Sequence, residues 1–299
     1  MTSVSSPELK HIGCNRPWLN LQTSYRMTRL TTDTDDPDHP EHKHDHEHEH
    51  NHENDLSFGD IVIDRKRSDS KNKRTENNNK TKNESETGTD THKAVVVNVP
   101  PVTAEEWDVL DRGTTVAEDN PQYRSDAPIA IVVFMPELDS EFQYYSGVAP
   151  LTLTRLNGSG VNWYAFPQPR LRKVGSRGPV EVDINQIQPL RYHSRTFSVS
   201  HNRQFIEEIA ARGQLSRAPL VWANRTDNDS LSLLDGHKRV WASHVAGLET
   251  IQVLGMYLDD ETATRVWANR HLGGYNRAET NCAKERLKDE WGEDYRQFF

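Results

Sequence analysis

Apolar and polar positions between residues 56 and 175 follow the pattern of short strands separated by turns. A capping box from Thr103 to Glu106 predicts one short helix in this stretch. We therefore predict a small β-rich module over residues 56–176, interrupted by a polar insertion at 65–92 that we expect to be disordered. The predicted strands cover 56–64, 94–99, 129–134, 151–154 and 163–166.

After a Gly-rich linker at 175–179 the pattern changes to alternating strands and amphipathic helices. Gly213 and Gly247 are placed to end two of these helices in the left-handed conformation. The predicted strands cover 180–187, 220–223, 230–234 and 251–257, and the predicted helices cover 201–212, 237–246, a segment from Asp259 to Gly273, and 277–291. The fold class that follows is α+β, with a mixed α/β domain over 180–275 and a charged helix within 276–299.

The apolar stripes of these helices predict which residues face the core. For the first helix the inner face is Phe205, Ile206, Ile209 and Ala210, and for the second it is Val240, Trp241, His244 and Val245. In the third helix we expect Val266 and Trp267 to be buried.

Composition adds a disordered tail to this organisation. Of 299 residues only 34% are apolar and the mean hydropathy is −0.85, which is low for a chain that folds throughout. We assign the low-complexity residues 1–55 to the tail, within which Met27 is a second candidate start. No apolar run is long enough for a membrane span or a secretory signal, so we expect a cytoplasmic protein without membrane contact. Cys14 and Cys282 are too far apart in the chain to indicate a disulfide scaffold or a Cys-built zinc finger.

The charge balance is acidic, with 36 basic and 45 acidic residues and a net charge of −9. After position 93 the only lysines are Lys173, Lys238, Lys284 and Lys288. An acidic, Lys-poor composition is typical of proteins made in high cytoplasmic salt, and the alternative is an ordinary mildly acidic surface. No broad basic face is present for DNA, whose binders typically neutralise on the order of six phosphates or more.

Histidines alternate with acidic residues inside the predicted tail. Imidazole and carboxylate groups both bind divalent cations such as Zn²⁺, so the tract is a candidate metal-binding segment. The alternative is a solvated tract whose affinity for metal is incidental. The candidate ligands are His42, His44, His46, His48, His50 and His52.

Aromatic residues cluster in the second half of the β-rich module. We interpret them as core residues rather than as a platform for a ligand, since aromatic side chains dominate protein cores. They are Phe142, Tyr144, Tyr145, Trp163, Tyr164 and Phe166.

The segment from Asp235 to Ala242 places two cations, Lys238 and Arg239, in the first turn of a predicted helix. Cations there oppose the helix dipole at a cost of roughly 0.3–1 kcal/mol each. An anion at the helix start would resolve this conflict, because backbone N–H groups and both side chains would converge on a phosphate. Gly236 would let the backbone approach closely. The alternative is an exposed helix start whose cations pair with Asp235 or Glu249.

Residues 180–280 resemble the N-terminal domain of ParB partition proteins, within the ParB/sulfiredoxin superfamily. The family's Pro-Asn-Pro-Tyr-Gln-Pro-Arg box corresponds to 189–195, and its Gly-Gln-x-x-Pro box to 213–221. Its Gly-Glu-Arg-Arg phosphate box corresponds to 236–239, followed by Ala-Gly-Leu at 246–248. Its Glu-Asn-x-x-Arg box corresponds to 268–279. The boxes occur in the family's order over about a third of the chain.

This resemblance implies a nucleotide-binding domain that takes CTP, in preference to ATP or ADP, with Mg²⁺. It implies phosphate contacts from Gly236, His237, Lys238 and Arg239 and further contacts from Arg195 and Gln214. It also makes Asn269 a candidate partner of the bound cation. The expected role is regulatory, in plasmid or chromosome partition or in gene regulation, through a DNA-binding partner, with weak direct DNA contact and with a homodimer as a candidate assembly.

Three substitutions depart from the family pattern: His237 replaces Glu, Lys238 replaces Arg, and Ala268 replaces an acidic residue beside the metal. A missing carboxylate weakens Mg²⁺ binding, so at most weak hydrolysis of the nucleotide is expected. The helix at 277–291 is too short for the family's helix-turn-helix region.

Two further readings stay open at this stage. Asp235-Gly-His-Lys-Arg239 resembles the Asp-Gly-His-His-Arg box of free-serine kinases, with His193 in place of their glutamate base. The sulfiredoxin reaction needs a Cys in this box, where this sequence has His237 instead. No carboxylate cluster in the sequence indicates a two-metal nuclease. The other reading is a nonenzymatic interaction scaffold, which stays open because a fold alone does not establish a function.

Overall fold

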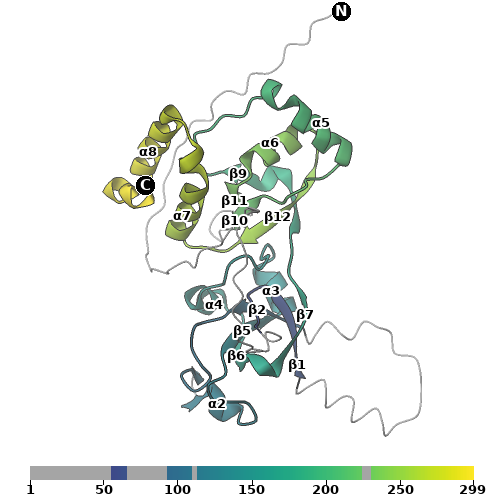
Figure 1. The fold of residues 1–299 in the computed structure, drawn as a ribbon, viewed down its shortest axis with the longest axis vertical. Helices are drawn as coiled ribbons and strands as arrows, with labels where there is room; N and C mark the ends of the chain where they lie inside the picture. The colour runs from purple at the N-terminus through teal and green to yellow at the C-terminus, as the bar shows by residue number, and fades with distance from the viewer. Residues whose placement is uncertain (1–54, 66–92, 110–112, 224–229) are drawn as a thin grey trace, which may run out of the picture. The chain divides into compact units, whose positions relative to one another are not determined.

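The computed structural model describes residues 55–65, 93–109, 113–223 and 230–299. The predicted tail, the predicted insertion and the histidine candidates from His42 to His52 lie outside these ranges, apart from residues 55 and 65. The described residues form a mixed α+β fold, as the sequence predicts (Figure 1). Their contacts separate a larger unit, within 32–188 and 197–258, from a smaller unit that comprises 189–196 and 259–299.

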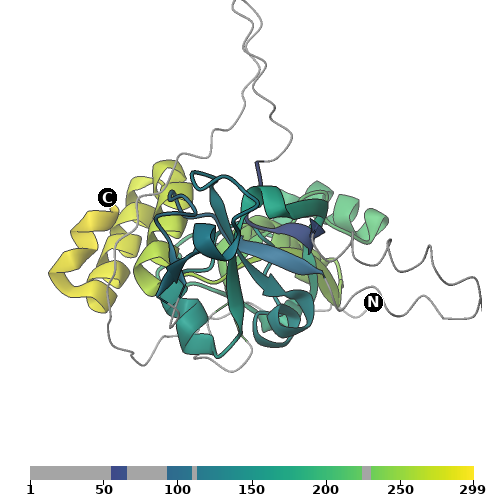
Figure 2. The ribbon, with the colours of Figure 1, turned by 90° about the horizontal axis from the view of Figure 1, so that it is seen from below.

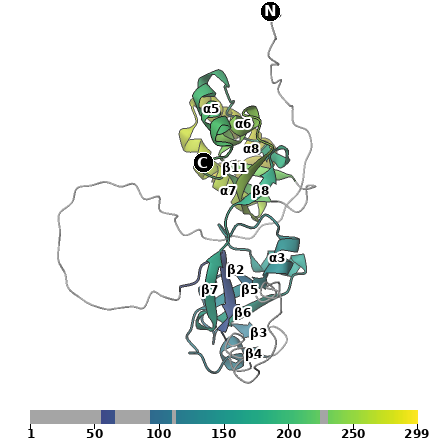
Figure 3. The ribbon, with the colours of Figure 1, turned by 90° about the vertical axis from the view of Figure 1, so that its right-hand side faces the viewer.

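The first sheet of the larger unit is antiparallel, with the strand order β6-β5-β2-β1-β7 (Figure 3). Its strands are β1 Asp60–Asp64, β2 Ala94–Asn98, β5 Ile129–Phe134, β6 Trp163–Pro167 and β7 Leu171–Ser176. The same part of the chain contains the short pair β3 Asp108–Val109 and β4 Thr114–Thr115, and the helices α2 Val116–Asp119, α3 Met135–Glu141 and α4 Leu153–Ser159.

The second sheet of the larger unit has the order β8-β12-β10-β11-β9 and is mixed, because β10 and β12 are parallel. A parallel pair needs a crossover, and the chain between β10 and β12 contains α6. Helices α5 and α6 lie side by side (Figures 1 and 3). The elements are β8 Val180–Asp183, β9 Ile187–Pro189, α5 Arg203–Arg212, β10 Leu220–Ala223, β11 Leu231–Asp235, α6 His237–Val245 and β12 Thr250–Met256.

One hydrophobic core runs through both sheets of the larger unit, from Val95 and Ile131 to Val221 and Val253. The backbones also meet: Ser146 N donates to the Gly255 carbonyl at 3.2 Å, and Gly255 N donates to Ser146 Oγ at 2.9 Å. A Cβ at position 255 would lie 1.9 Å from the Tyr144 carbonyl oxygen. Glycine is therefore required where the two sheets touch.

The smaller unit contains α7 Asp260–His271 and α8 Arg277–Trp291, which lie side by side (Figures 1 and 2). Trp267 of α7 is fully buried and packs edge-to-face on Tyr192 with ring centroids 4.6 Å apart. Leu287 of α8 is also fully buried. The segment 189–196 thus shares its packing with the C-terminal helices. Short 3-10 helices occur at Gln168–Arg170, Ile184–Gln186, Ser200–Asn202, Leu272–Gly274 and Gly292–Phe298.

Two local predictions are wrong. Only half of the predicted capping box at Thr103 and Glu106 forms. Both Thr103 donors bond to Glu106 Oε2 at 2.8 and 2.9 Å, but Glu106 N donates to the Thr103 carbonyl rather than to its Oγ1, and no helix follows. The N–H groups of Ala104 and Glu105 donate instead to the carbonyls of residues 127 and 125. Residues 151–154, predicted as a strand, lead into α4, whose N-cap Thr152 accepts from Arg155 N at 3.2 Å.

The predicted inner faces need correction at three positions. Ile206 and Ile209 of α5 are buried, but Ala210 is exposed. On α6, Val240 is buried, while His244 and Val245 are exposed. Ala242 takes their place, fully buried against Ile206 and Ile209. Val266 and Trp267 are buried as predicted.

Candidate functional site

The turn from β11 into α6 is built on Gly236, which has φ +95°. A Cβ here would lie 2.8 Å from the Pro219 Cβ and 3.0 Å from Arg239 Nη2. Any other residue at this position would destabilise the fold, because of the left-handed conformation and because of this close approach. The chain therefore enters α6 through a tight backbone turn next to the start of β10.

The first turn of α6 has no side-chain cap and no acidic residue. Val240 N donates to the Gly236 carbonyl at 3.0 Å, which closes the first turn. The N–H groups that precede this bond have no intrahelical acceptor, and the positive end of the helix dipole lies there. Such a helix start favours an anion.

Lys238 is the exposed cation of this turn. Its Nζ lies 4.8 Å from the centre of the Phe205 ring on α5. The aromatic face therefore holds the ammonium group at the helix start, an interaction worth about 0.5–1 kcal/mol at an exposed site.

Arg239 has a structural role in the same turn. Its Nη1 donates to the carbonyls of Arg217 and Ala218 at 2.9 and 3.0 Å, and its Nη2 lies 3.5 Å from Asp235 Oδ2. The guanidinium thus ties the turn before β10 to the start of α6. Removing it would leave those carbonyls without this donor, so any effect on a ligand would be mixed with an effect on folding.

His237 is only 4% exposed, and its ring centroid lies 5.5 Å from that of Trp241. Among the predicted phosphate contacts the exposed side chain is therefore Lys238. Gln214, the remaining predicted contact in the larger unit, is exposed just after Gly213. Gly213 ends α5 in the left-handed conformation, as predicted.

Arg195 and Asn269, the other two predicted contacts, belong to the smaller unit. Arg195 donates through Nε and Nη2 to Glu279, both at 3.1 Å, and through Nη2 to the Gly274 carbonyl. Its guanidinium also lies 4.9 Å from the centre of the Tyr275 ring. The hydrogen bond from Arg195 lowers the pKa of Glu279, with further support from the backbone of Asn276. Asn269 is exposed on α7.

His193, the candidate base of the kinase reading, is buried in the smaller unit. Burial lowers its pKa to about 3, and the nearby His271, Arg195 and Arg286 act in the same direction. Its Nδ1 shares a hydrogen bond of 2.8 Å with the Tyr275 hydroxyl. His193 is therefore neutral at physiological pH, and it is a buried residue rather than a surface one.

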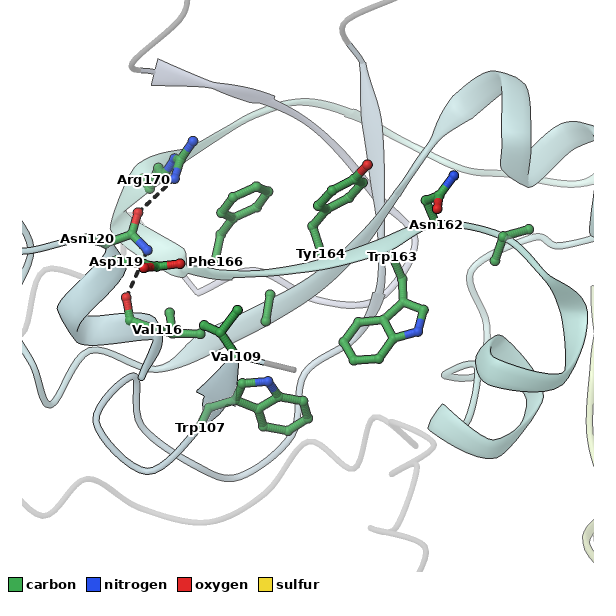
Figure 4. Close-up of a pocket in the computed structure, with 12 residues that line it drawn as sticks. Trp107, Val109, Val116, Asp119, Asn120, Asn162, Trp163, Tyr164, Phe166 and Arg170 are labelled. Carbon is green, nitrogen blue, oxygen red and sulfur yellow. Dashed lines mark hydrogen bonds between the residues drawn. The ribbon is translucent and has the colours of Figure 1, made fainter. Parts of the chain in front are cut away.

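The aromatic cluster of the β-rich module divides in two. Phe142 and Tyr145 are fully buried, as predicted for core residues. Trp163, Tyr164 and Phe166 instead line a cavity of 660 Å³, shown in Figure 4. The core interpretation is wrong for Tyr164, which is 40% exposed. The alternation of side chains along β6 could have indicated that one face of this strand is less covered.

No model of a known protein family matches the chain, and no curated protein matches it either. No helix among the described residues combines the length and the apolar character needed to cross a membrane.

Part of the chain is similar in structure to ParB N-terminal domains. The C-terminally truncated ParB of Caulobacter crescentus in complex with CTP-gamma-S shares 20% identity at a TM-score of 0.29, over 38% of this chain and 63% of that chain. The same protein in complex with the centromeric parS site shares 19% identity at a TM-score of 0.27, over 40% of this chain and 63% of that chain. A Pnob8-like ParB-N domain shares 14% identity at a TM-score of 0.26, over 37% of this chain and 44% of that chain. The chain spans less than two thirds of the length of each of these solved chains.

Proposed function

We propose that this chain is a ParB-like nucleotide-binding regulatory protein whose phosphate site is the start of α6, at Gly236–Arg239. The observation that carries the proposal is the uncapped first turn of α6, which begins at an obligatory glycine and carries the exposed Lys238. A helix start without a cap or an acidic residue costs stability. A bound phosphate would supply the missing negative charge.

Different groups at the α6 start would bind the phosphate and position the turn. The backbone N–H groups of the first turn would bind phosphate oxygens, and Lys238 would add a charge-assisted hydrogen bond. Arg239 acts as a positioning residue, because it fixes the turn at Arg217 and Ala218 against the helix start.

The sequence boxes favour CTP over ATP and ADP, bound with Mg²⁺. Ala268 replaces the acidic residue of the last box and is buried, so it offers the cation no ligand. We therefore expect a protein regulated by nucleotide binding, with hydrolysis weak at most. Its output would pass to a DNA-binding partner in DNA partition or gene regulation, and a homodimer is the assembly that we would test first. The buried, neutral His193 gives no support to the phosphotransferase reading.

The test is titration calorimetry of the full chain with CTP, ATP, ADP and GTP, with and without Mg²⁺. We expect micromolar binding of CTP and a loss of at least about tenfold in Lys238→Ala, since a hydrogen bond to a charged group contributes about 1.5–3 kcal/mol. The matched control is Lys284→Ala, because Lys284 is also an exposed helical lysine whose Nζ lies 4.6 Å from a ring centre, that of Phe299. This control should bind CTP as the unaltered chain does.

Two results would count against the proposal. If the chain binds none of the four nucleotides, the α6 start has no nucleotide function and the scaffold reading gains weight. If it binds ATP or ADP selectively, the CTP assignment is wrong, and an assay for phosphoryl transfer to serine becomes the next experiment.

A further inference from the structure

The smaller unit contains a cluster of aromatic and imidazole rings. Trp267 and His271 lie four residues apart on one face of α7, with ring centroids 5.6 Å apart. The centroid of the His193 ring lies 5.3 Å from that of His271 and 6.5 Å from that of Trp267. Tyr275 follows α7 after one turn of 3-10 helix, and its ring centroid lies 6.0 Å from those of both histidines. Two segments that are distant in the sequence thus bring two imidazoles together.

The two imidazoles are close enough to share a metal ion. One ring nitrogen of His193 and one of His271 lie within 4.8 Å of each other. Two Zn–N bonds of about 2.0–2.1 Å at a tetrahedral angle place the two nitrogens about 3.3 Å apart. Rotation of the His271 side chain, which is only partly buried, can close the remaining distance.

The His193 ring is held in a fixed orientation. Its Nδ1 shares a hydrogen bond of 2.8 Å with the Tyr275 hydroxyl, and its backbone carbonyl accepts from Arg286 Nη1 at 2.6 Å. The tyrosine oxygen can accept the Nδ1 proton, and in that tautomer Nε2 carries the electron pair that binds a metal. Such a partner on the second ring nitrogen is usual for histidine ligands and orients them. The site does not require that either ring lacks other contacts, since coordination would replace a hydrogen bond at the same nitrogen.

The surroundings distinguish this pair from two histidines on an open surface. His193 is 8% exposed and Trp267 is fully buried, so apolar rings cover the inner side of the pair and limit the access of water. His271 is partly exposed, which gives an ion access from the solvent. The nearby Arg195 is paired with Glu279 at 3.1 Å, which reduces its repulsion of a cation.

We propose that His193 and His271 bind a divalent transition-metal ion of the class to which Zn²⁺ belongs. Imidazole is a ligand that suits Zn²⁺, Cu²⁺ and Ni²⁺. Water would complete the coordination, as it does at zinc sites that keep an open position. The ion would tie the segment 189–196 to the end of α7, both of which belong to the smaller unit. The site uses neither Lys238 nor the start of α6, so it does not depend on the proposed nucleotide binding.

The test is the stability of the full chain with and without Zn²⁺. The protein is first freed of metal with a chelator, and urea unfolding is then measured at neutral pH over a series of Zn²⁺ concentrations. We expect the urea midpoint to rise with the Zn²⁺ concentration, because an ion that binds only the folded chain stabilises it. The candidate ligands at 42–52 follow one another closely in the sequence, so the unfolded chain keeps them, and binding there should add little to the midpoint.

His193→Gln and His271→Gln should each need at least about tenfold more Zn²⁺ for the same rise, since even the partners that orient a ligand contribute this much to affinity. The partly exposed His271 keeps the test informative if His193→Gln does not fold. The matched control is His201→Gln, at an exposed position of the larger unit, which should keep the full rise. With Co²⁺ as the probe, the difference in visible absorption between the unaltered chain and His271→Gln reports coordination by this ring directly.

Two outcomes would overturn the proposal. A urea midpoint that does not respond to Zn²⁺ would show that the pair does not bind the ion. An equal rise in the unaltered chain, His193→Gln and His271→Gln would show that other ligands hold it. Neither outcome bears on the α6 start, because the calorimetry with nucleotides is carried out without Zn²⁺.

Discussion

Helices α6 and α8 begin in opposite ways. In α8, Asn276 Oδ1 accepts from Glu279 N and Glu279 Oε2 accepts from Asn276 N, both at 2.9 Å, so the helix start is capped by its own side chains. The start of α6 has neither a side-chain cap nor an acidic residue, and it carries Lys238 and Arg239 instead. The start of α8 is therefore stabilised without a ligand. The start of α6 gives up part of that stability, which is the physical reason to assign a ligand to it.

The largest effect that we expect at the α6 start is from Gly236→Ala. The substitution combines the strain of a positive φ, about 1–2 kcal/mol, with a Cβ placed 2.8 Å from Pro219. Overpacking of this kind costs typically 1–3 kcal/mol, so we expect the free energy of unfolding in urea to fall by about 3 kcal/mol. The control is Gly158→Ala in α4, where a Cβ would meet nothing within 4 Å. Equal stabilities of the two variants would contradict the tight turn.

The free energy of unfolding should depend on pH through His193, whose carbonyl accepts a hydrogen bond from Arg286 of α8. The pKa of His193 is lowered to about 3, so between pH 6.5 and 3 the unfolded chain binds a proton that the folded chain does not. Stability is therefore full above pH 6.5 and falls as the pH decreases, by up to about 1.4 kcal/mol per pH unit from this group. Urea unfolding between pH 6.5 and 5 measures this slope in the window where the unfolded chain begins to protonate this histidine.

The control for this slope is a pair of histidine variants. His193→Gln should flatten the dependence in that window whatever its absolute stability, and His201→Gln, at an exposed position, should leave it unchanged. A slope that survives His193→Gln would mean that another group carries the acid sensitivity.

Asn276→Ala tests the capped start of α8. It removes the acceptor for Glu279 N at 2.9 Å and should lower the free energy of unfolding by about 1 kcal/mol. Asn269→Ala, at an exposed position within α7, is the control and should cost nothing. A cost for Asn276→Ala below a few tenths of a kcal/mol would remove the contrast between the two helix starts.

Helix ends depend on local signals, and the end of α5 at Gly213 was predicted in this way. Asn276 with Glu279, Asp259 before α7, and Gly213 after α5 each act through the backbone within four residues, so their effect can be recognised without knowing the fold. The contacts proposed at the α6 start also follow from local features, since Gly236 and Lys238 lie within one turn.

Features that depend on distant residues could not be predicted in this way. The predicted box of Thr103 and Glu106 forms only in part and begins no helix, because the backbone of the next residues bonds to residues 125 and 127. The inner face of α6 is rotated from the predicted one, since the small Ala242 packs against α5 and leaves the larger Val245 exposed. The burial of His193 and the exposure of Tyr164 likewise depend on which segments pack around them.

The smallest expected effect is the most informative about α6. Lys238→Glu replaces an unfavourable cation at the helix start by a favourable anion, each worth about 0.3–1 kcal/mol, and loses the contact with Phe205, 4.8 Å away, worth about 0.5–1 kcal/mol. The net result should be a gain of about 0.5 kcal/mol in the free energy of unfolding at low salt, together with loss of CTP binding. Lys284→Glu, in the middle of α8, also loses a contact with an aromatic ring but gains nothing from the helix dipole, so it should be slightly destabilising. If Lys238→Glu is instead the less stable of the two, the cations at this helix start serve folding, and the argument for a bound phosphate loses its physical basis.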